Sequence, residues 1–80
     1  IAVATDGRVY SVAQATSELV IYEPSGQLVA QVPTDREPWG VAVDREGKIW
    51  VGCAGAGRLQ RFDRSGALLV SVLCPEGIRA

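Results

Sequence analysis

The chain has 80 residues, of which 48% are hydrophobic and 21% charged, and its formal net charge at pH 7 is −1. This composition is typical of a folded globular protein, and the balanced charge provides no basic surface for nucleic acid or for an anionic membrane. We therefore expect no nucleic-acid partner and no membrane partner, since no apolar run approaches the roughly 18 residues that span a bilayer.

A repeat of 40 residues runs through the sequence. Shifted by 40 positions, residues 1–10 align with residues 41–50 without a gap, and turns recur together with strands. A plain meander of two hairpins would not repeat its turns in this way. A period of this length with β patterning is typical of propeller blades, so we predict one blade at residues 1–40 and a second at residues 41–80.

The first half of each unit predicts a hairpin. Residues 1–5 are short, alternating and rich in β-branched side chains, and Asp6 and Gly7 follow them. An Asp-Gly step between alternating runs is a strong hairpin signal, because glycine accepts a positive φ without steric cost. The returning strand is predicted at residues 8–13, and the same pattern recurs 40 positions later.

The second half of each unit predicts another hairpin. Strands are expected at residues 18–22 and 27–32, and Pro24 and Gly26 stand between them at favoured turn positions. Pro33 then ends the last strand. Because no segment keeps a helical period, the sequence predicts an all-β fold, a β-propeller with two four-stranded antiparallel blades.

Both faces of each predicted sheet are apolar. In the strand at residues 8–13, Tyr10 and Val12 lie on one face while Val9 and Ala13 lie on the other. A free-standing sheet would have one polar face, whereas a blade is covered on both faces by its neighbours. We expect the paired aromatic residues of the two units to pack between blades, namely Tyr10, Trp50, Tyr22 and Phe62.

Residues 38–51 and 57–66 carry a pattern of turn and core residues that resembles two families. They read Pro-Trp-Gly-Val-Ala-Val-Asp-Arg-Glu-Gly-Lys-Ile-Trp-Val and Gly-Arg-Leu-Gln-Arg-Phe-Asp-Arg-Ser-Gly, similar to blades of NHL-type propellers and of the gluconolactonase and senescence-marker-protein family. The first unit keeps much of this pattern but has Ala4 where the family prefers Asp. The resemblance covers the whole chain and implies a six-bladed propeller whose first strands line a central channel.

Two blades cannot close such a ring. Each open end would expose a whole blade face, well beyond the few hundred Å² of apolar patch that a soluble monomer tolerates. Either the chain is part of a longer propeller, or three copies associate head to tail as a homotrimer of six blades. We favour the homotrimer over a tetramer of eight blades, because Ala80 would meet the next copy's Ile1 in the register by which Gly40 meets Val41.

The loops at the channel rim hold the candidate binding residues. Arg36 and Arg79 are candidates for holding an anion, and Trp39 for an apolar platform, with Glu37 and Glu76 beside them. These loops are predicted around residues 33–39 and 73–79. The sequence favours the simpler interpretation, in which the loops are solvated and Trp39 packs beneath the rim.

Enzymatic chemistry finds little support in the sequence. The chain has no His, the usual proton carrier near neutral pH, and Ser25 and Ser65 stand in turns. Resemblance to metal-dependent lactonases implies oxygen ligands near the starts of first strands, where this chain has Trp39-Gly40 and Arg79-Ala80.

We therefore predict no catalytic residue, no metal and no cofactor. The favoured function is a non-enzymatic, self-assembling propeller unit that acts as a scaffold or as a binding module for a protein, peptide or glycan. The alternative is a fragment of a metal-dependent lactonase or hydrolase, whose ligands lie mostly on other blades.

Overall fold

The computed structural model describes residues 1–74, which form eight strands and contain no helix. The strands build two antiparallel sheets in which neighbours along the chain are also neighbours in the sheet. Blade 1 contains β1 (Ala2–Val3), β2 (Val9–Ala13), β3 (Glu18–Tyr22) and β4 (Leu28–Pro33). Blade 2 contains β5 (Pro38–Val43), β6 (Ile49–Cys53), β7 (Arg58–Phe62) and β8 (Leu68–Leu73). The predicted all-β fold with two four-stranded antiparallel sheets is confirmed, and no helical membrane span occurs in the described part of the chain.

The hairpin turns have the backbone geometry that their sequences predict. Gly7 has a φ of 89° and Gly47 a φ of 79°, in the left-handed region that glycine enters without a steric penalty. Each glycine amide donates a hydrogen bond to the carbonyl oxygen three residues earlier, that of Ala4 at 2.9 Å and that of Asp44 at 3.0 Å. These turns fix the register between β1 and β2 and between β5 and β6.

Two strand boundaries differ from the sequence prediction. β5 begins at Pro38, three residues earlier than expected, because Pro38 and Gly40 pair with the end of β6. β1 is limited to Ala2–Val3, and the positions that match Pro38 and Gly40 under the repeat would precede residue 1. The linker between the blades is therefore residues 34–37, shorter than the predicted loop at residues 33–39.

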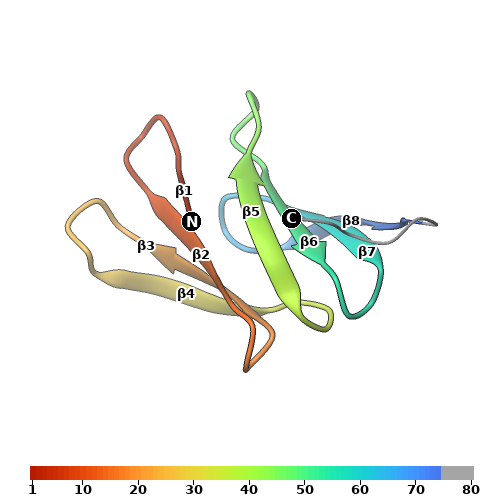
Figure 1. The fold of residues 1–80 in the computed structure, drawn as a ribbon. Helices are drawn as coiled ribbons and strands as arrows, with labels where there is room; N and C mark the ends of the chain where they lie inside the picture. Colours follow the sequence, from red (N-terminus) through yellow and green to blue (C-terminus); the bar gives the residue numbers. More distant parts are fainter. Residues whose placement is uncertain (75–80) are drawn as a thin grey trace.

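The two blades pack face to face through apolar side chains. Figure 1 shows β5 lying against β1 and β2, while β4 and β8 lie on the outer sides. Alternate residues of β2 and β3 meet alternate residues of β6 and β7. The buried side chains of this core are Tyr10, Leu19 and Ile21 from blade 1 and Ile49, Val51, Cys53 and Phe62 from blade 2. The expected packing of aromatic residues between blades is confirmed for Tyr10 and Phe62.

Each blade also has a face that the chain leaves uncovered. We call the face of blade 1 that carries Ile21 its front face, and the face of blade 2 that carries Phe62 its back face. The front face of blade 1 packs against the back face of blade 2 in the core. Successive residues of a strand point to opposite faces. The front face of blade 2 therefore carries Arg61, and the back face of blade 1 carries Tyr22. Trp50 pairs with Arg61 across this front face and is only half-buried.

The outermost strand of blade 2 is exposed along its whole length. Its large apolar side chains keep between 44% and 60% of their surface in water, namely Leu68, Leu69, Val70, Val72 and Leu73. A contiguous apolar surface of this kind marks a place where another molecule or another part of the protein packs.

The core between the blades should dominate the stability of the chain. Phe62 is 1% exposed, so Phe62→Ala should lower the free energy of unfolding by about 3–5 kcal/mol, as large core truncations do. Trp39, which is 52% exposed, provides a matched control, and Trp39→Ala should change stability by less than about 0.5 kcal/mol. Chemical denaturation at a fixed protein concentration measures both, and equal losses would contradict the assignment of the core.

Candidate functional site

The linker between the blades brings together three of the residues predicted for the rim. Arg36 and Glu37 are exposed in the linker, and Trp39 is the second residue of β5. Glu76 and Arg79, the other two predicted rim residues, lie outside the described residues. The structure therefore places Arg36, Glu37 and Trp39 in one short segment at the beginning of β5.

Trp39 is displayed at the surface by an irregularity in the sheet. Pro38 pairs with Cys53 and Gly40 pairs with Gly52, so the register shifts across Trp39 and leaves it without a partner in β6. Bulges of this kind often re-aim a side chain. Trp39 is 52% exposed, so the expectation that it packs beneath the rim is wrong.

Glu37 is held by its backbone and by a neighbouring turn. Its φ is 53°, which is uncommon for a residue other than glycine, and its carbonyl oxygen accepts a hydrogen bond from the Ala54 amide at 2.9 Å. Its side chain lies over Gly55, where an added Cβ would be only 3.0 Å from the Glu37 Cγ. Gly55 therefore provides the space in which the Glu37 side chain lies.

The Gln60 side chain binds the backbone of the linker, a role that was not predicted from the sequence. Its side chain is buried in β7, and its Oε1 accepts hydrogen bonds from the Asp35 amide at 2.9 Å and the Cys53 Sγ at 3.6 Å. Burial raises the pKa of the Cys53 thiol, which therefore keeps its proton and acts as a weak donor. The signal was present in the sequence, because Val20 stands at the matching place in blade 1.

The rim segment combines opposite charges with an aromatic surface. The Asp35 carboxylate lies 3.8 Å from the Arg58 Nε, whereas Arg36 forms no ion pair with any carboxylate of residues 1–74. A guanidinium can bind an anionic group, and an exposed indole can stack on a planar or sugar ring. This arrangement suits binding and offers no nucleophile with an adjacent base.

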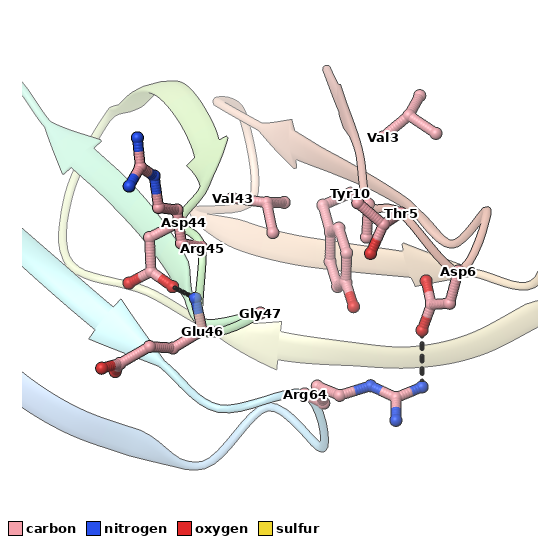
Figure 2. A pocket seen from close by; sticks show the side chains of 11 residues that line it. Val3, Thr5, Asp6, Tyr10, Val43, Asp44, Arg45, Glu46, Gly47 and Arg64 are labelled. Atoms are coloured by element: carbon pink, nitrogen blue, oxygen red, sulfur yellow. Dashed lines mark hydrogen bonds and ion pairs between the residues drawn. The ribbon is translucent and has the colours of Figure 1, made fainter.

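A pocket of about 400 Å³ lies at the other end of β5. The turn between β1 and β2 and the turn between β5 and β6 form its sides (Figure 2). Its charged lining consists of Asp6, Asp44, Arg45, Glu46 and Arg64, and Tyr10 and Val43 provide apolar surface. The Arg64 Nη2 bonds the Asp6 Oδ2 at 2.7 Å across the two blades.

Asp44 is fixed beside this pocket by five hydrogen bonds. Its Oδ1 accepts from the Glu46 amide at 2.9 Å and the Lys48 amide at 3.0 Å. Its Oδ2 accepts from the Trp50 Nε1 at 3.0 Å, the Arg61 Nε at 3.2 Å and the Arg61 Nη2 at 2.7 Å. The Arg61 guanidinium carbon also lies 5.3 Å from the centre of the Trp50 ring, so Asp44, Trp50 and Arg61 form one polar cluster on the front face of blade 2.

The protonation of Asp44 follows from these contacts. Burial alone would raise its pKa, but the hydrogen bonds from Arg61, Lys48 and Trp50 outweigh that effect and lower the pKa to about 2. Asp44 therefore stays ionised near neutral pH and serves as an anchor for its neighbours. A carboxylate with so low a pKa is a poor proton donor.

The described residues do not fit a bound metal ion. A hard divalent cation needs several converging oxygen ligands. Within residues 1–74, no group of three His, Cys, Asp or Glu side chains lies close enough together to hold one. At the start of β5, where the resembling lactonases place such ligands, the chain has Trp39 and Gly40.

Asp44 should make stability depend on acid pH. Because its folded-state pKa is about 2, below the ordinary value of 3.8, its contribution is present above about pH 4 and is lost as the pH falls toward 2. Asp44→Asn should therefore lower the Tm near neutral pH, and its difference from wild type should shrink between about pH 4 and pH 2. Thermal melting followed by circular dichroism measures this, and a difference that is constant down to pH 2 would show that the carboxylate is not held in its charged form.

A family model described as the SMP-30/Gluconolactonase/LRE-like region matches residues 27–79, which is more than half of the chain. The match begins beside β4 and includes all of blade 2. No curated protein matches the sequence.

Several solved propeller structures contain a similar pair of sheets. Hydrazine synthase of Kuenenia stuttgartiensis has a TM-score of 0.84 at 16% identity, and the match covers 92% of this chain and 23% of that chain. A streptogramin B lyase has a TM-score of 0.83 at 18% identity, covering 94% of this chain and 26% of the lyase. Virginiamycin B lyase from Staphylococcus aureus has a TM-score of 0.79 at 14% identity, with coverages of 91% and 25%.

These similarities establish the fold and leave activity open. The chain spans about a quarter of the length of the solved structures that it matches. The resemblance to the gluconolactonase and senescence-marker-protein family is confirmed, as is the β-propeller fold. The NHL-type resemblance and the number of blades in the complete ring stay predictions.

Proposed function

This chain belongs to the SMP-30/gluconolactonase/LRE-like family, and we propose that it is a non-enzymatic unit that supplies two adjacent blades to a six-bladed propeller. Two further copies of the chain complete the ring, so the functional protein is a homotrimer. The observation that carries this proposal is the pair of uncovered blade faces. The uncovered front face of blade 2 is built from the strand positions that are buried on the front face of blade 1. The uncovered back face of blade 1 is built from the positions that are buried on the back face of blade 2.

The cost of leaving these faces in water supports the proposal. Val3, Leu28 and Val29 of blade 1 are between 40% and 63% exposed, and the apolar residues of β8 are exposed as well. Burial of apolar surface is worth about 25 cal/mol per Å², so a covered face stabilises the assembly substantially. Ring closure by rotation also removes every open face, which an open-ended stack cannot do.

The rim is the proposed binding surface for a protein, peptide or glycan. In a ring of three chains Arg36, Glu37 and Trp39 occur three times around the channel, and Glu76 and Arg79 stay predicted members of the same rim. A symmetric set of sites favours a multivalent ligand, because linked sites raise the effective concentration of the second contact. A single asymmetric substrate would contact only some of these symmetric sites.

The native mass tests the assembly directly. Light scattering behind size-exclusion chromatography, at micromolar concentration, should give the mass of three chains. Trp50→Asp should reduce this mass, because it places a second carboxylate beside Asp44 on the front face of blade 2. Arg45→Asp, a charge change in an exposed turn, is the control and should leave the mass at three chains. A wild-type mass of one chain would end the proposal.

The non-enzymatic part of the proposal has its own test. The family name includes a gluconolactonase, so the rival function is lactone hydrolysis with a bound divalent metal. We expect the assembled protein to bind no stoichiometric calcium or zinc and to leave glucono-δ-lactone to its spontaneous hydrolysis. Metal analysis after dialysis and a pH-stat assay measure both, and turnover that requires stoichiometric metal would establish the rival function.

A further inference from the structure

The pocket between the hairpin turns of the two blades has no part in the proposed function. Its volume of about 400 Å³ lies within the range of small-molecule sites. One chain supplies both of its sides, through the turn between β1 and β2 and the turn between β5 and β6 (Figure 2). The pocket is therefore formed within a single chain, independently of the homotrimer.

The two turns have the same backbone hydrogen bonds. The Ala4 carbonyl oxygen accepts from the Gly7 amide at 2.9 Å, and the Asp44 carbonyl oxygen accepts from the Gly47 amide at 3.0 Å. The amides of Ala4 and Asp44 each donate, at 2.9 Å, to the carbonyl oxygen four residues later in the chain. Ala4 therefore has the place in the turn of blade 1 that Asp44 has in the turn of blade 2, but only Asp44 carries a carboxylate.

In blade 2 the Asp44 carboxylate accepts hydrogen bonds from three kinds of donor. The Glu46 amide donates at 2.9 Å, the Trp50 Nε1 at 3.0 Å and the Arg61 Nη2 at 2.7 Å. A main-chain amide, an aromatic side chain and a guanidinium thus bind one carboxylate together.

Blade 1 keeps the first two kinds of donor and lacks the carboxylate. Under the 40-residue repeat the Asp6 amide corresponds to the Glu46 amide, and the Tyr10 hydroxyl replaces the indole N–H of Trp50. Ala4 has no side-chain acceptor for either of them. Ala4, Asp6 and Tyr10 all line the pocket, so the place of the missing carboxylate belongs to it.

The Tyr10 hydroxyl is directed toward this place. Its ring is buried in the core, whereas its oxygen faces the Asp6 and Arg64 side chains across the pocket (Figure 2). Burial alone would lower the pKa of Arg8, but contacts with Tyr10 and Glu23 raise it. Because a guanidinium can only donate, its contact with Tyr10 uses the hydroxyl oxygen and leaves the hydroxyl hydrogen for an acceptor.

A guanidinium is present on this side of the pocket as well. The Arg64 Nη2 binds the Asp6 Oδ2 at 2.7 Å, which neutralises that carboxylate, and a guanidinium has further N–H groups for a second acceptor. Asp44 and Glu46 on the opposite side are both paired with Arg61, at 2.7 Å and 2.9 Å. The carboxylates that line the pocket are therefore held in ion pairs, which lowers their repulsion of a bound anion.

We propose that this pocket binds a small organic acid, whose carboxylate takes the place in blade 1 that the Asp44 carboxylate has in blade 2. The carboxylate accepts hydrogen bonds from the Asp6 amide and the Tyr10 hydroxyl, and Arg64 supplies the positive charge. The rest of the molecule occupies the remaining volume between the two turns.

Sodium acetate tests the site, because acetate is a carboxylate small enough to enter the pocket. In amide correlation NMR spectra at pH 7, acetate should shift the Asp6 resonance in a saturable way, whereas sodium chloride at the same ionic strength should not. The Glu46 amide already bonds Asp44 and is the internal control. An Asp6 resonance that acetate leaves in place, or that moves no more than the Glu46 resonance, would overturn the proposal.

A substitution that supplies the carboxylate from the chain itself gives a second test. Ala4→Asp should raise the Tm and abolish the acetate response of Asp6, because its side chain occupies the same place. Ser25→Asp adds the same charge in the exposed turn between β3 and β4, and it should preserve the acetate response. An Ala4→Asp protein that still binds acetate as the wild type does would show that the anion binds elsewhere.

Tyr10→Phe covers the case in which Ala4→Asp does not fold, since it keeps the buried ring. Loss of the hydroxyl should weaken acetate binding by about tenfold, as expected for a hydrogen bond to a charged group. Unchanged acetate binding would remove Tyr10 from the site and contradict the proposed geometry. These results do not depend on the native mass, so the homotrimer and this site stand or fall separately.

Discussion

The packing of one blade's front face on the next blade's back face is the interaction on which the structure depends. Within the chain this contact buries Tyr10, Ile21 and Phe62 in one apolar core. A β-sheet that is apolar on both faces is stable only when both are covered. The chain covers one face of each blade, and in the proposed assembly the same kind of packing covers the other face.

The two blades meet this requirement with different chemistry. The front face of blade 1 is apolar, whereas the front face of blade 2 carries the cluster of Asp44, Trp50 and Arg61. The charges of this cluster are paired and hydrogen-bonded within the blade, which lowers the cost of burying them when another blade covers the face. The cluster also adds direction to a contact with another blade, since a guanidinium donates its hydrogen bonds only to suitably placed oxygen atoms.

Much of the fold could be predicted from local sequence signals. The Asp6-Gly7 turn, the alternating strands and the repeat determined the element order, and the structure confirmed the two sheets. The site was less predictable, because it depends on contacts between segments far apart in the chain. The exposure of Trp39 arises from a shift in strand register, and the role of Gln60 arises from a backbone amide 25 residues away. The register shift leaves no pattern in spacing or composition, and the role of Gln60 leaves only a polar residue where blade 1 has Val20.

Small-angle X-ray scattering tests most directly whether copies cover the open faces. The Cα radius of gyration of the single chain is 11.7 Å. A compact assembly of three chains, about 240 residues, should have a radius of gyration of about 18 Å. We predict the larger value at micromolar concentration, with a distance distribution that fits a closed ring. A concentration-independent value near that of the single chain would show that both faces are stable in water, and would contradict the account.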